Sequence, residues 1–90
     1  MIKGLGVPKD YAMAKQLFQQ SAEQGDATAQ DNLGYMYQHG LGMPKDYVMA
    51  EQWFIESMKQ GNEMGRKNLC RLYFIQKKFE ATNEMDCSRE

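Results

Sequence analysis

The sequence is poor in the residues that most catalytic and metal sites need, with one histidine and two cysteines. Cys70 and Cys87 are seventeen positions apart, which is neither a metal-ligand spacing nor a disulfide framework. We therefore expect reduced thiols and no metal or cofactor. As a catalytic base, His39 would need a nucleophile and an orienting acid nearby, and no recognisable pattern supplies them. The sequence predicts no catalytic site.

Charge of one sign and long apolar runs are also missing. The chain has eleven Lys and Arg residues and twelve Asp and Glu residues, which gives a net charge of −1, and it has no block of like charge. Nucleic-acid binding would require a basic stripe, so we expect no nucleic-acid partner. No segment approaches the roughly 20 apolar residues of a membrane span. Residues 1–10 lack the apolar stretch of a secretory signal, so we expect the chain to carry no export instruction of its own.

The most informative feature that is present is an internal repeat. Residues 4–25 and 40–61 align at a spacing of thirty-six positions, and 14 of the 22 aligned residues are identical. A period of this length is typical of stacked repeats, in which each unit packs against the next. An active site is needed once, whereas these residues recur in register. The repeated residues therefore indicate architecture.

Each copy predicts a turn followed by an amphipathic helix. A Gly-x-Gly turn precedes Pro8 and Pro44, which suit the first turn of a helix. Asp10 and Asp46 then place a carboxylate near the positive end of that helix, and a glycine closes its other end. The predicted buried faces comprise Tyr11, Ala14, Phe18, Ser21 and Ala22, and then Tyr47, Ala50, Trp53, Phe54, Ser57 and Met58.

A second type of helix alternates with the first. Residues 27–38 form one such helix, and residues 62–79 repeat it with only three of twelve positions identical. Decay of this kind is typical of a terminal repeat. We expect the last helix to run past Lys77. The predicted organisation is a single helical-repeat domain at 1–79 followed by a polar, frayed tail at 80–90.

One complete copy of a known pattern is present, and its spaced residues are Ala29, Leu33, Gly34, Tyr37, Gly40, Gly42, Asp46, Ala50, Trp53 and Gly61. This pattern resembles the Sel-one-like repeat, a relative of the tetratricopeptide repeat. The resemblance implies an all-α fold, an α-solenoid of antiparallel helix pairs with about four helices. It would contain one complete 36-residue repeat plus partial repeats at both ends.

The same resemblance implies a non-catalytic scaffold or adaptor that binds a protein or peptide partner. Secreted, cysteine-rich relatives carry paired cysteines within each repeat, and this chain does not. The cytoplasm is therefore the favoured compartment, unless a longer parent chain carries a signal upstream of Met1.

Helices of the second type line the concave groove in this family, which suggests a protein-binding face. Tyr35 and Arg71 are the expected anchors, because tyrosine and arginine are common among binding hot spots. An ordinary solvated helix face is the alternative, and Phe74 can instead cap the end of the core. The predicted face comprises Thr28, Asp31, Tyr35, Gln38, Met64, Lys67, Arg71 and Phe74.

Met1 occupies the repeat position of Tyr37, so we expect the first hairpin to lack its opening helix. We expect this to expose parts of Tyr11, Leu17 and Phe18, as an open end for self-association. A truncated piece of a longer array with no independent partner is an alternative. A small hydrolase that depends on a histidine is a further, less favoured one.

Overall fold

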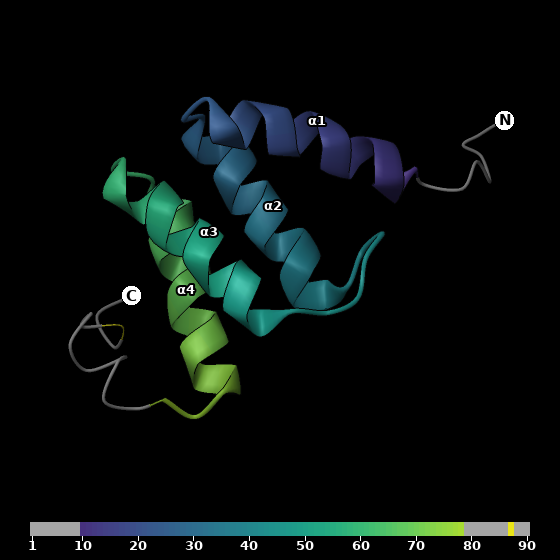
Figure 1. The fold of residues 1–90 in the computed structure, drawn as a ribbon. Coiled ribbons are helices and arrows are strands. Elements are labelled where there is room, and N and C mark those ends of the chain that lie inside the picture. Colours follow the sequence, from purple (N-terminus) through teal and green to yellow (C-terminus); the bar gives the residue numbers. More distant parts are fainter. Residues whose placement is uncertain (1–9, 79–86, 88–90) are drawn as a thin grey trace, which may run out of the picture.

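The structure is a computed structural model that describes residues 10–78 and Cys87. Its four helices are α1 (Tyr11–Glu23), α2 (Ala27–His39), α3 (Tyr47–Lys59) and α4 (Glu63–Ile75). Each helix packs against the next, α2 also contacts α4, and the chain runs back and forth through the stack (Figure 1). The described residues contain no strand, which confirms the all-α solenoid of helix pairs predicted from the repeat. None of the described helices has the length and hydropathy of a membrane span.

Every helix begins at a side-chain cap. Asp10 accepts a hydrogen bond of 2.9 Å from the backbone N–H of Met13, and Asp46 accepts one of 3.1 Å from that of Met49. The two predicted carboxylates are therefore the N-caps of α1 and α3, and each satisfies a backbone donor that the helix leaves free. Pro44 was predicted in the first turn of α3. It lies two residues before the N-cap Asp46, and α3 begins at Tyr47.

Helices α1, α3 and α4 end with one backbone pattern, in which a lysine takes the place of the glycine at α4. Gly25 and Gly61 follow α1 and α3 at φ 94° and 85°, in the left-handed region that favours glycine. The prediction that the last helix runs past Lys77 is wrong, since α4 ends at Ile75. Lys77 adopts φ 59°, and the next backbone N–H bonds back to the carbonyl of Tyr73 at 2.8 Å. This lysine closes its helix as the glycines close theirs.

The core consists of two clusters that share one half-buried tyrosine. One lies between α3 and α4, and the other between α1 and α2. Tyr37 packs against both of them. Their buried members are Ala50, Phe54, Leu69, Leu72 and Tyr73 in the first cluster, and Ala22, Ala29 and Leu33 in the second.

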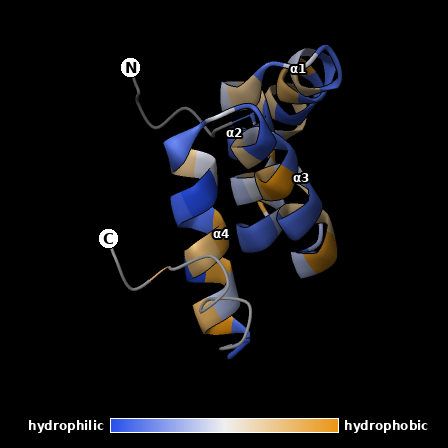
Figure 2. Ribbon diagram, turned by 90° about the vertical axis from the view of Figure 1, so that its left-hand side faces the viewer, coloured by the Kyte–Doolittle hydropathy of each residue, from blue (hydrophilic) through white to orange (hydrophobic). Residues whose placement is uncertain are grey.

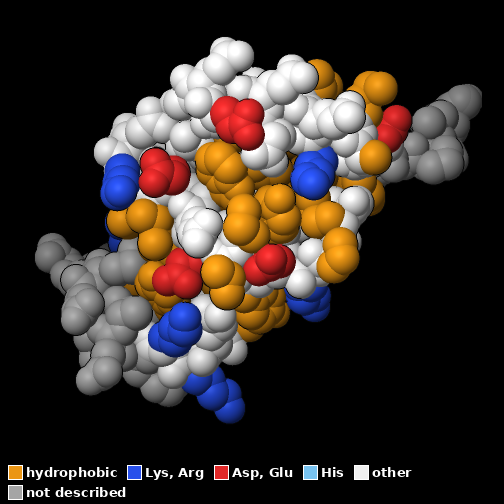
Figure 3. All heavy atoms as spheres, in the orientation of Figure 1, with side chains coloured by type: hydrophobic (Ala, Val, Ile, Leu, Met, Phe, Trp, Pro, Cys, Tyr) orange, Lys and Arg blue, Asp and Glu red, His pale blue; other side chains and the backbone are white. Residues whose placement is uncertain are grey.

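Hydrophobic side chains are not confined to the core. The second half of α4 is mainly hydrophobic, whereas its first half is hydrophilic (Figure 2). Hydrophobic side chains also gather on the face of the molecule shown in Figure 3, over the region of α1 and α3. Phe74 and Ile75 on α4 and Met13 and Leu17 on α1 are all at least half exposed, so both helices leave apolar surface uncovered.

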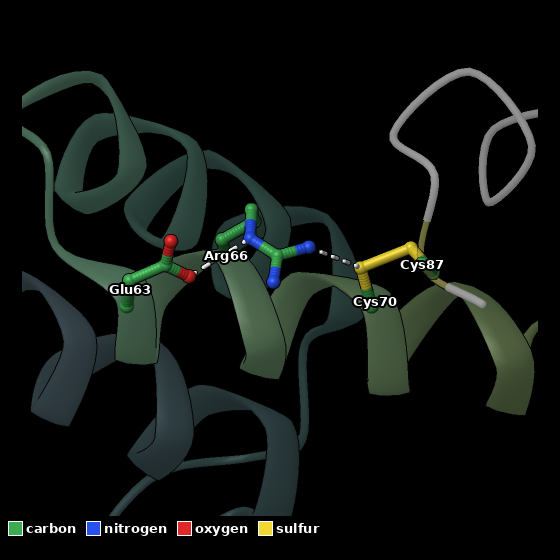
Figure 4. Close-up of a disulfide and its surroundings, with 4 residues drawn as sticks. All are labelled: Glu63, Arg66, Cys70 and Cys87. Atoms are coloured by element: carbon green, nitrogen blue, oxygen red, sulfur yellow. Dashed lines mark hydrogen bonds and ion pairs between the residues drawn. A yellow bond between two sulfur atoms is a disulfide. The ribbon is translucent and has the colours of Figure 1, made fainter. Parts of the chain in front are cut away.

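Cys70 on α4 and Cys87 form a disulfide bond, so the expectation of reduced thiols is wrong (Figure 4). Their Cα atoms lie 5.7 Å apart, within the usual range for a disulfide, and both residues are buried. The guanidinium of Arg66 lies between the Glu63 carboxylate and the Cys70 sulfur, with its Nη1 4.0 Å from Sγ. The remainder of the predicted tail at 80–90 lies outside the described residues.

Candidate functional site

All eight residues of the predicted binding face lie on α2 and α4, which contact each other. Their exposure is uneven. Lys67 is half-buried, and Gln38 is buried. Asp31 is only 9% exposed, so it contributes almost no surface to the predicted face. The exposed members are Thr28, Tyr35, Met64, Arg71 and Phe74.

Asp31 is buried because it pairs with a residue that sequence reasoning missed. The Asn68 side chain donates a hydrogen bond of 2.6 Å from Nδ2 to Oδ1 of Asp31. Arg71 in turn donates from Nη1 to Oδ1 of Asn68 at 3.3 Å. The three side chains form a polar chain that joins α2 to α4 and ends at an exposed guanidinium. One signal was available, since Asn68 is among the three residues shared by the two helices.

The charge on this face is asymmetric as a result of that pairing. The Asp31 carboxylate is withdrawn from solvent and satisfied by an amide. Lys67 and Arg71 belong to the same face, and the Arg71 side chain is exposed. The exposed part of this face therefore presents positive charge beside apolar and aromatic side chains.

Tyr35 and His39 stand one helical turn apart on α2, with ring centroids 4.2 Å apart. Both side chains are exposed, and Tyr35 is 48% accessible. His39 occupies the last turn of α2, where a cationic imidazole would suit the negative end of the helix. Within residues 10–78 and Cys87, no cluster of His, Cys, Asp or Glu could hold a metal ion.

The predicted open end on α1 is partly exposed. Leu17 is 58% accessible, whereas Tyr11 and Phe18 are half-buried. Tyr11 lies against the loop glycine Gly42, and Phe18 packs against the cluster between α1 and α2. Met13, which the sequence did not single out for this surface, adds a further exposed apolar side chain.

A hollow on the outer side of α3 was also not anticipated. Its volume is about 250 Å³, and the Trp53 indole forms part of its wall. The indole Nε1 is buried and has no hydrogen-bond partner among the residues that the structure describes. All lining residues come from this one helix: Met49, Gln52, Trp53, Ile55 and Glu56. The hollow is separate from the eight-residue face on α2 and α4.

Comparison with known families gives one clear result. The family model described as Sel1 repeat matches residues 2–26 and 27–62, which together exceed half of the chain. The second match contains α2 and α3 complete, and the first contains α1. Repeats of this kind generally mediate protein–protein interaction and form non-catalytic scaffolds. No curated protein matches the chain.

Proposed function

Because the chain belongs to the Sel1 repeat family, we propose that it is a scaffold whose α2–α4 face binds a segment of a partner protein. The observation that carries the proposal is the fixed position of Arg71. Its guanidinium is held by Asn68, which is itself held by the buried Asp31. A preorganised side chain loses less conformational entropy on binding than a free one.

The neighbouring side chains suit an anchor role. The Tyr35 ring packs against the His39 ring at a tilt of 44°, which restricts it while leaving almost half of Tyr35 accessible. Met64 and Phe74 are 50% and 51% exposed, so both offer apolar area that a partner can cover. Aromatic residues, methionine and arginine are the types enriched in protein interfaces. The face thus combines restricted anchors with apolar surface.

The charge of the face defines the partner chemistry. A guanidinium presents a fork of donors that matches a carboxylate, and Lys67 adds a second cation. The only carboxylate of the predicted face is Asp31, which is buried and already paired. The preferred ligand is therefore a peptide segment with an acidic residue close to an apolar one.

Selection from a display library of random peptides tests this proposal. We expect the wild-type protein to enrich peptides that carry Asp or Glu next to apolar residues. The Tyr35→Ala/Arg71→Ala variant should lose on the order of a hundredfold in affinity for them, because hot-spot residues carry most of the binding energy. Val48→Ala on α3 is the matched control, since Val48 is exposed at 63% and lies outside the face.

Circular dichroism on all three proteins establishes that the variants remain folded. Equal affinity of the double variant and the wild type for the selected peptides would refute the assignment of the face. Enrichment of peptides without acidic residues would refute the partner chemistry. Binding that weakens with rising salt agrees with a charged contact.

A further inference from the structure

The contact between α3 and α2 depends on a residue without a side chain. A Cβ atom at Gly34 would lie 2.7 Å from the ring of Phe54 and 3.2 Å from the carbonyl oxygen of Ala50. Phe54 and Ala50 are both fully buried. At Gly34, therefore, the first-type helix α3 approaches the preceding second-type helix α2 too closely for a side chain to fit without displacing its neighbours.

Cys70 is the equivalent of Gly34 one period later, on α4. The equivalent position in a repeat points in the same local direction, towards the place where the next first-type helix would pack. Cys70 does not belong to the cluster that α4 shares with α3, so it lies away from that interface. At this position Cys70 is instead bonded to Cys87, and the Cα atoms of the two cysteines lie 5.7 Å apart.

Helix α3 packs against α2 through a set of residues that recurs on α1, where these residues are less buried. Ala50, Phe54 and Ser57 of α3 are all fully buried, and Phe54 and Ser57 make direct contacts with α2. The residues at the three equivalent positions of α1 are identical and are only half-buried. They are Ala14, Phe18 and Ser21, and the adjoining Leu17 is exposed.

These two surfaces are complementary in kind. The exposed side of α1 has the same residues that α3 packs against the second-type helix α2. Helix α4 is also a second-type helix. Contact between α1 of one molecule and α4 of another would be heterologous, and a heterologous contact that does not close produces open chains of molecules. The disulfide occupies the α4 half of that contact.

We propose that the Cys70–Cys87 disulfide keeps this protein from stacking head-to-tail, by covering the surface of α4 that fits α1 of a second copy. The Cys70 side chain itself adds to the block, because even a Cβ at Gly34 would collide with the phenylalanine ring. The two proposals are tested with different residues, Phe18, Cys70 and Cys87 here and Tyr35 and Arg71 there, so either proposal can fail without the other.

Site-directed cross-linking tests the proposed contact. In the Phe18→Cys/Cys87→Ser variant, the thiol introduced at position 18 should face Cys70 of the next molecule, as Phe54 faces Gly34. Two thiols then form an intermolecular disulfide while glutathione disulfide, the added oxidant, is reduced to two glutathione molecules. We expect covalent multimers in non-reducing electrophoresis.

The matched control is Gln20→Cys/Cys87→Ser, because Gln20 is exposed on the opposite side of α1. A disulfide requires closely placed Cβ atoms, so multimers should be on the order of tenfold more abundant for position 18 than for position 20. Circular dichroism before oxidation confirms that both variants are folded. Equal multimer yields from folded variants would overturn the proposal.

Sedimentation over a wide concentration range provides a second measurement without cross-links. The wild type should remain at the monomer mass of 10.4 kDa, whereas Cys70→Gly/Cys87→Ser should gain mass with concentration, by at least about twofold. Adding Phe18→Asp to that variant should restore the monomer. A folded Cys70→Gly/Cys87→Ser protein that stays monomeric throughout would overturn the proposal.

Discussion

The hydroxyl group of Ser57 on α3 donates a hydrogen bond of 2.8 Å to the backbone carbonyl of Ala27, in the first turn of α2. Asn62, the N-cap of α4, donates from its amide to both oxygens, at 2.8 Å to Ser57 Oγ and 3.3 Å to the carbonyl. One buried hydroxyl therefore connects three helices. Gly65 allows this arrangement, since a Cβ there would lie 2.7 Å from the same hydroxyl oxygen.

Replacing Ser57 with alanine should destabilise the fold. The substitution leaves the half-buried amide of Asn62 and the carbonyl of Ala27 with one partner fewer, and such a loss costs about 1–3 kcal/mol. Ser21→Ala is the matched control, because Ser21 is the half-buried equivalent on α1. Urea unfolding followed by circular dichroism measures both. Equal effects of the two substitutions would contradict the structural role of the Ser57 hydroxyl.

Gly34→Ala should also destabilise the protein, although alanine is the better helix former. The gain in helix propensity is about 1 kcal/mol. The added methyl group would collide with the fully buried Phe54 ring and approach the Ala50 carbonyl, and overpacking of this kind costs about 1–3 kcal/mol. We therefore expect a net loss of stability that the second substitution Phe54→Leu partly relieves. A stabilised Gly34→Ala protein in thermal unfolding would show that the ring moves away at little cost.

Asn68→Ala tests the polar chain between α2 and α4. Removing the amide leaves the buried Asp31 carboxylate without its donor and frees the Arg71 guanidinium. We expect stability to fall by about 1–3 kcal/mol and affinity for acidic peptides to fall as well. The control is Asn32→Ala, at the half-buried equivalent position on α2. Unchanged peptide affinity in the Asn68→Ala protein would mean that Arg71 needs no positioning.

Local sequence patterns predicted the helices and their caps well. Asp10 and Asp46 cap their helices because a carboxylate can reach free backbone donors within three residues, and this requires no distant contact. The helix period and the glycine positions likewise follow from neighbours in the chain. The family pattern then placed these helices in an α-solenoid.

Features that depend on contacts between helices were not predictable in the same way. Asp31 would lie on the outer face of α2 if the helix were isolated. In the fold it is buried and accepts a hydrogen bond from Asn68 on α4, thirty-seven positions later in the chain. Lys77 adopts a left-handed backbone conformation that lysine rarely favours. The pairing of Cys70 with Cys87 depends on where the chain returns to α4, which the spacing of two cysteines does not specify.

Reduction of the disulfide should lower the stability of the protein measurably. The bond joins residues seventeen positions apart. In the loop-entropy description, closing a loop of this length raises the free energy of the unfolded chain by about 3 kcal/mol. Dithiothreitol should therefore shift the urea midpoint of the wild type downwards and leave that of Cys70→Ser/Cys87→Ser unchanged. Alkylation with mass spectrometry counts the free thiols in each sample. A wild type with two alkylated cysteines and an unshifted midpoint would show that Cys87 contributes nothing to the stability of α4.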